Sequence, residues 1–127
     1  MKFEYTRRAS GDFEEVVERV KKLAMEEGFG ILAVHDFQKS FASRGIEFVP
    51  FTMVEICKPE IAAEVLKKDI NLGLFMPCRI NIYEKGREVV VSGIAADMLA
   101  GFTDSDLGEI PDRVAGAIRR IVDGASA

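Results

Sequence analysis

The sequence predicts an α+β protein in which helices pack on a mixed five-stranded sheet, in the order β-α-β-α-β-α-β-β-α. Apolar residues recur at helical spacing in residues 13–24 and 111–122. Runs rich in β-branched residues, above all 51–57 and 88–94, are typical of strands. Glycine, proline and capping residues separate these segments at short intervals, which indicates one domain, 1–127, with one core.

The chain begins with a predicted strand and a predicted helix. Residues 2–7 alternate between apolar and polar side chains, as in a half-buried strand. Asp12 can accept a hydrogen bond from the amide of Glu15, whose side chain can reach back, as in a capping box. Gly28 supplies the left-handed residue that ends the helix.

A second strand is predicted over residues 29–35, followed by a short helix between a cap at Asp36 and a stop at Gly45. Pro50 precedes a third strand, 51–57.

Pro59 suits the first turn of a helix that runs to Lys68. Residues 69–77 are predicted to be irregular. Strands over 79–84 and 88–94 flank Lys85-Gly86, which is a hairpin signal. Residues 95–109 are expected to contain a helical turn around Met98 and Leu99, followed by a polar loop. The last helix begins near Pro111.

Strand 51–57 is apolar on both faces, so both faces of the sheet need cover. Four helices could cover both sides, or a second copy of the chain could cover one of them. Because isologous dimers are the commonest oligomers, we expect a homodimer.

A set of short motifs follows Gly28 at a consistent spacing: residues 28–32 (GFGIL), 50–51 (PF), 55–59 (EICKP), 61–62 (IA), 71–78 (NLGLFMPC) and 82–84 (IYE). In these motifs the chain resembles domain-of-unknown-function family 302. The resemblance implies a small single-domain α+β protein that pairs as a dimer, and it implies no established reaction. The chain departs from the family's pattern at Lys58, where asparagine is frequent, and at His35, where an acidic or polar residue is usual. No role is therefore expected from an amide at position 58, or from His35 across the family.

The only two cysteines each lie where a predicted strand meets a loop: Cys57 stands two residues before Pro59, and Cys78 follows Pro77. Cys57 precedes a helix N-terminus, where the helix dipole favours a thiolate. Glu55, on the same strand face, would oppose it.

The distance between the two thiols depends on how the strands are paired. A right-handed parallel crossover would place Cys57 and Cys78 at opposite ends of the sheet. Residues 69–77 are also long enough to return the chain, which would make the strands antiparallel and the thiols neighbours. The structural alternative is that both are small buried residues, the commonest state of free cysteine.

The apolar residues Leu74, Phe75 and Met76 stand in a non-periodic segment and are expected to bury in the core, in a dimer contact or around a ligand. Gly73 permits close backbone approach. A dimer contact is our first expectation, and a ligand groove is the alternative. Its candidate ligand-binding residues are Cys57, Pro59, Gly73, Phe75, Pro77 and Cys78.

No complete catalytic or metal-ligating set is found in the sequence. His35 is the only histidine, the two cysteines lack the close spacing of a structural zinc site, and His35 continues the strand face of Phe29, Ile31 and Ala33. The acidic loop 104–109 lacks the EF-hand pattern. The sequence predicts no catalytic residue and no metal ligand, and it identifies no cofactor.

Composition limits the partners and the location. A net charge of -4 with scattered basic residues argues against nucleic acid as the main partner. No apolar run approaches the roughly 18 residues that span a bilayer, and the N-terminus lacks the apolar centre of a signal peptide. We therefore expect a cytoplasmic protein with reduced cysteines. Only three amide side chains, Gln38, Asn71 and Asn81, stand beside many charged residues, which leans toward a thermophilic source.

These observations favour a homodimeric module that binds or senses a small molecule and is not an enzyme. The alternative is a thiol-dependent redox or metal-assisted enzyme that uses Cys57 and Cys78, which would require an accessible thiol of depressed pKa. A structural domain within a larger complex is a third possibility.

Overall fold

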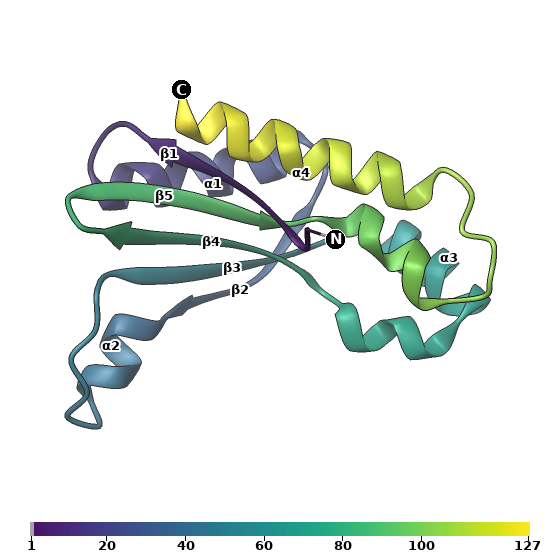
Figure 1. The fold of residues 1–127 in the computed structure, drawn as a ribbon, viewed down its shortest axis with the longest axis horizontal. Coiled ribbons are helices and arrows are strands. Elements are labelled where there is room, and N and C mark those ends of the chain that lie inside the picture. Colours follow the sequence, from purple (N-terminus) through teal and green to yellow (C-terminus); the bar gives the residue numbers. More distant parts are fainter. Residues whose placement is uncertain (1) are drawn as a thin grey trace.

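The computed structural model describes residues 2–127, and the predicted α+β class and element order are confirmed (Figure 1). The strands are β1 (Glu4–Ala9), β2 (Gly30–Asp36), β3 (Phe51–Cys57), β4 (Cys78–Lys85) and β5 (Glu88–Ile94). The α-helices are α1 (Phe13–Glu26), α2 (Phe37–Ala42), α3 (Pro59–Lys68) and α4 (Ile110–Ser126). Two 3₁₀ helices, η1 (Ile70–Phe75) and η2 (Ala96–Phe102), occupy segments in which no full helix was predicted.

The sheet is antiparallel throughout, with the order β1-β5-β4-β3-β2, so the prediction of a mixed sheet is corrected. The chain between β3 and β4 returns to the end of the sheet that it left. Ile56 therefore pairs with Cys78, and both cysteines lie at the same end of the sheet. The hairpin predicted at Lys85-Gly86 joins β4 to β5, and Gly86 adopts the left-handed region with φ of 64°.

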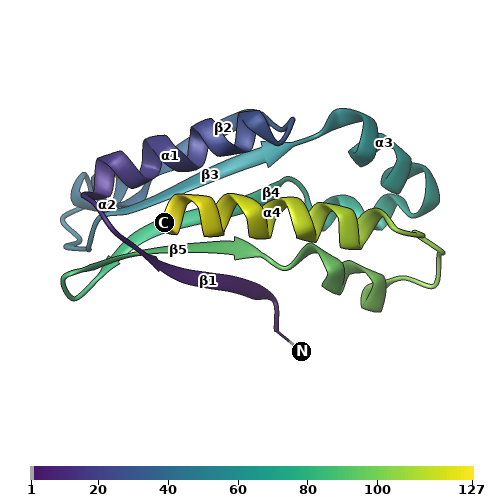
Figure 2. The ribbon, with the colours of Figure 1, turned by 90° about the horizontal axis from the view of Figure 1, so that it is seen from above.

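Helices α1 and α4 lie side by side on one face of the sheet (Figure 2). The core between these layers is formed by the alternate residues of β3 and β4 that face the helices, including Val54, Ile56, Ile80 and Ile82, all fully buried. At the start of α1, Asp12 accepts a hydrogen bond from the Glu15 amide at 2.8 Å, as predicted.

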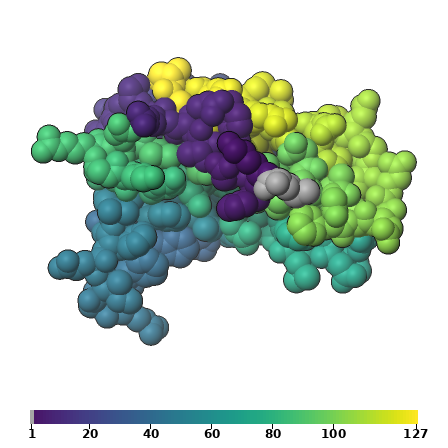
Figure 3. All heavy atoms as spheres, in the orientation of Figure 1, coloured from purple at the N-terminus to yellow at the C-terminus, as the bar shows by residue number. Residues whose placement is uncertain are grey.

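The other face of the sheet is open within residues 2–127, except at the corner beside α2. The two long helices share one face, so the four helices do not cover both. Helix α2 and the following loop, 43–50, project from one end of the sheet as an arm (Figure 3). Phe37 packs against Phe51 at 5.4 Å between ring centroids, which joins this arm to the corner of the open face.

A β-bulge changes the predicted faces of β2. The register of β2 against β3 shifts between Ile31 and Ala33, so Ile31 pairs with Ile56 on the helix side, whereas Ala33 pairs with Glu55 on the open side. Because a bulge adds one residue, the side chains after it change faces. His35 therefore lies on the open face, and the prediction that it continues the face of Ile31 is wrong.

No helix in the described part of the chain has the length and apolar character needed to cross a bilayer.

Candidate functional site

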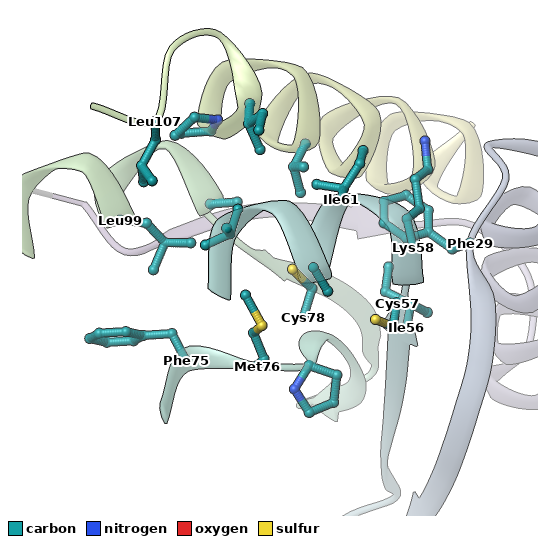
Figure 4. A pocket seen from close by; sticks show the side chains of 17 residues that line it. Phe29, Ile56, Cys57, Lys58, Ile61, Phe75, Met76, Cys78, Leu99 and Leu107 are labelled. Atoms are coloured by element: carbon teal, nitrogen blue, oxygen red, sulfur yellow. The ribbon is translucent and has the colours of Figure 1, made fainter. Parts of the chain in front are cut away.

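An apolar cavity of about 60 Å³ lies at the end of the sheet where β3 finishes and β4 begins (Figure 4). Its lining comes from the strand ends, from α3, from the two 3₁₀ segments and from the first turns of α4. The lining residues are Phe29, Ile56, Cys57, Lys58, Ile61, Ala62, Val65, Phe75, Met76, Pro77, Cys78, Ala96, Leu99, Leu107, Ile110, Pro111 and Val114. All except Lys58 have apolar or thiol side chains, so the cavity favours apolar groups.

The chain folds around this cavity because two prolines direct it at the end of the sheet. Pro59 occupies the first turn of α3, where its missing amide hydrogen costs no helical hydrogen bond. Pro77, which follows a cis peptide bond, leads from η1 into β4. A small second core of Val65, Leu72 and Leu107 holds α3, η1 and the segment before α4 together.

The two thiols approach the same cavity from neighbouring strands. Ile56 pairs with Cys78 on the helix side of the sheet, and because side chains alternate along a strand, Cys57 leaves β3 on the other side. Both cysteines nevertheless line the cavity, which lies at the end of the sheet. In Figure 4 the sulfur atoms of Cys57, Cys78 and Met76 lie around one part of the cavity. Both cysteines are free.

Burial raises the pKa of both thiols. For Cys78 it raises the pKa from 9.0 to about 11, and the neighbouring Cys57 adds to the effect. For Cys57 burial again raises the pKa, and the Glu60 carboxylate contributes. Both side chains are therefore predominantly protonated at neutral pH, opposite to the thiolate that thiol chemistry requires.

Lys58 is the one charged residue of the cavity lining. Its Nζ lies 4.7 Å from the centroid of the Phe29 ring, a cation–π contact at one end of the cavity. Exposed apolar side chains lie beside the cavity. Leu74 is 85% exposed, and the centroid of the Phe102 ring lies 5.3 Å from that of Phe75, which lines the cavity. Leu74, which was expected to bury, is therefore not covered by its own chain.

The structure brings together four of the six candidate ligand-binding residues. Cys57, Phe75, Pro77 and Cys78 all line the cavity. Two candidates lie outside the lining. Pro59 is exposed at the start of α3, and Gly73 faces away, against Leu66, whose Cδ2 would lie 3.2 Å from an added Cβ.

The sequence-based interpretation missed the far wall of the cavity, which includes Leu99, Leu107 and Ile110. These residues come from 95–110. The helical turn predicted around Met98 and Leu99 corresponds to η2, but the segment after it was predicted to be a polar loop. The sequence signal for this wall was the spacing of its apolar residues. Ala96 and Leu99 are three apart, as are Leu107 and Ile110. Phe29 was also missed, because its role depends on Lys58 folding over it.

A second polar cluster lies on the open face, away from the cavity. The Glu55 carboxylate on β3 contacts side chains from both flanking strands. His35 Nε2 lies 3.0 Å from Glu55 Oε1, and Arg79 Nε lies 3.3 Å from Glu55 Oε2. The hydrogen bond from His35 is the main cause that lowers the pKa of Glu55, and Arg79 contributes. Within residues 2–127, no group of three or more His, Cys, Asp or Glu side chains is arranged to hold a metal ion.

The comparisons with known proteins agree with this fold. A family model described as domain of unknown function DUF302 matches residues 5–125. The crystal structure of an uncharacterised conserved DUF302 protein from Bacillus stearothermophilus superimposes with a TM-score of 0.90 at 27% sequence identity, and the match covers 100% of both chains. No curated protein matches the chain.

Proposed function

The chain belongs to the DUF302 family, a family defined by a domain of unknown function, and on this premise we propose that it is a cytoplasmic, homodimeric module that binds a small molecule without catalytic machinery of its own. The apolar cavity at the end of the sheet carries this proposal. It joins residues from five separate segments of the chain and is lined almost wholly by apolar side chains. Cavities of this composition exclude water and take apolar groups.

The size of the cavity restricts what enters it. The volume of about 60 Å³ is the space open to the centre of a water-sized sphere. One water needs roughly 10–15 Å³ of such space, so the cavity has room for about four to six water-sized groups. The cavity therefore accepts an apolar group of only a few carbon atoms. A short alkyl chain fits this description, and a fused ring system does not.

The test is binding of 1-hexanol, a neutral molecule with a short alkyl chain, observed by saturation-transfer NMR on the ligand. Ala62→Phe places a ring in the cavity and is expected to abolish the transfer signal. Ala63→Phe adds the same ring to an exposed position of the same helix and is expected to retain it.

Unchanged hexanol binding in a folded Ala62→Phe variant would show that the cavity is not the binding site. If the phenylalanine prevents folding, Ala62→Leu makes the same comparison with a smaller side chain.

A second copy of the chain is the proposed cover of the open sheet face. Asn81 Oδ1 is buried on this face without a hydrogen-bond partner in residues 2–127, and a donor from a second copy would satisfy it. Glu55 and Arg79 also give the face both signs of charge. An isologous pairing can place Glu55 of one copy opposite Arg79 of the other, and the reverse.

The alternative of a thiol-dependent enzyme is less well supported, because burial raises the pKa of both Cys57 and Cys78. His35 and Glu55, the groups nearest in the sheet that could assist thiol chemistry, do not line the cavity.

A further inference from the structure

A polar cleft adjoins the apolar cavity and shares part of its wall. The cleft measures about 260 Å³ and lies between the first turns of α3 and α4. Lys58, Ile61 and Val114 line both spaces. A molecule that reaches past these three side chains would therefore place one part in an apolar environment and another in a polar one.

The cleft is positively charged in a protein whose net charge is -4. Three cations, Lys58, Arg113 and Arg120, line it, and one carboxylate, Asp112, offsets part of their charge. Arg120 is occupied by Glu27, which accepts hydrogen bonds from it at 2.9 and 3.1 Å.

Lys58 and Arg113 form no ion pair within residues 2–127. Lys58 lies close enough to help lower the pKa of Glu27, although Arg120 is the main cause. Two cations of the cleft thus remain available to an added anion.

The ends of two helices add to this charge. Helices α3 and α4 both begin beside the cleft, and neither has a side-chain hydrogen bond that caps its N-terminus. The positive ends of their dipoles reinforce the field of Lys58 and Arg113.

We propose that the ligand is an amphipathic organic anion, with its short alkyl group in the apolar cavity and its carboxylate in the cleft beside Lys58. The inference rests on the proposed function, because it assigns the polar part of the molecule whose apolar part fills the cavity. Lys58 is the residue that decides specificity. Its ammonium nitrogen lies over the ring of Phe29 in the cavity wall, and its side chain lines both spaces.

The experiment compares hexanoate with 1-hexanol, which have the same chain length and differ in the charge of the head. Dissociation constants are measured by saturation-transfer NMR at pH 7 for the wild type, for Lys58→Met and for Lys67→Met. Lys58→Met keeps an unbranched side chain of similar length and removes the charge. Lys67 is exposed near the other end of the same helix and serves as the control.

We expect the wild type to bind hexanoate about fivefold more tightly than hexanol, as for a partly exposed charged contact. Lys58→Met should remove this preference, so that hexanoate and hexanol bind with equal dissociation constants, and Lys67→Met should retain it. Equal binding of the two ligands by the wild type, or a preference that survives in Lys58→Met, overturns the assignment of the anion but leaves the apolar cavity as the binding site. Failure of both ligands to bind overturns the proposed function as well.

Discussion

Burial at the start of β4 raises the pKa of Cys78 from 9.0 to about 11. A raised pKa lowers the thiolate fraction at every pH below it, so alkylation of this thiol should be slow near neutrality and increase up to about pH 11. Cys57, with a smaller buried fraction, should react first. We predict this order for iodoacetamide labelling of the native protein between pH 7 and 11, followed by mass spectrometry.

The single variants separate the two thiols. Cys57→Ser leaves only Cys78 and should show the slower reaction, whereas Cys78→Ser leaves only Cys57. A fast reaction at pH 7 with an apparent pKa below 9 for either thiol would contradict the burial argument and favour thiol chemistry at this cavity.

The site could be predicted from the sequence only in part. The positions of Cys57 and Cys78 at strand ends are local features, and their neighbouring prolines marked them. Whether the two thiols lie at the same end of the sheet depended on the direction of β4. The length of residues 69–77 was compatible with either direction. The contribution of Leu107 depended on tertiary packing that no local pattern encodes.

Among the secondary-structure elements, β5 and α4 approach closely at Gly93. A Cβ at this position would lie 2.5 Å from Cγ2 of Ile118 and 3.1 Å from Cγ2 of Val122. We predict that Gly93→Ala lowers the free energy of unfolding by roughly 1–3 kcal/mol, because the helix must move or change rotamers. Urea denaturation measures the change.

Gly116→Ala on α4 is the matched control. An added Cβ there would have only the end of the Arg120 side chain within 4 Å, at 3.5 Å, and alanine favours a helix over glycine. This variant should be neutral or stabilising. Equal destabilisation by both variants would show that the close approach at Gly93 is not the cause.

The helices and strands themselves were predictable because their signals are local. The cap at Asp12, the proline at 59 and the glycine at 86 all mark boundaries that the structure retains. The bulge in β2 was not predictable, because the alternation of Ile31, Ala33 and His35 is compatible with an uninterrupted strand. Pairing with β3 decides it.

At the scale of the whole molecule, the open sheet face predicts self-association. Sedimentation equilibrium should give twice the mass of the chain. Met53→Arg, near the middle of this face on β3, should shift the protein toward the monomer because it places a charge in the contact. Lys67→Arg on α3 is the control. A monomeric wild type at all accessible concentrations would rule out the homodimer.

The arm formed by α2 and residues 43–50 lies at the opposite end of the sheet from α3 (Figure 1), and residues of α3 line the apolar cavity. A dimer centred on Met53 of the open face would therefore leave the α3 end of the sheet, and the cavity there, accessible to a ligand.

The binding of a small apolar group in the cavity is tested most directly by methyl NMR of the wild type during a titration with 1-hexanol. We predict saturable shifts of the methyl resonances of Val65, Leu99 and Leu107, which line the cavity. Shifts confined to the exposed side chains of Ile70 and Leu74, or no shifts at all, would contradict it.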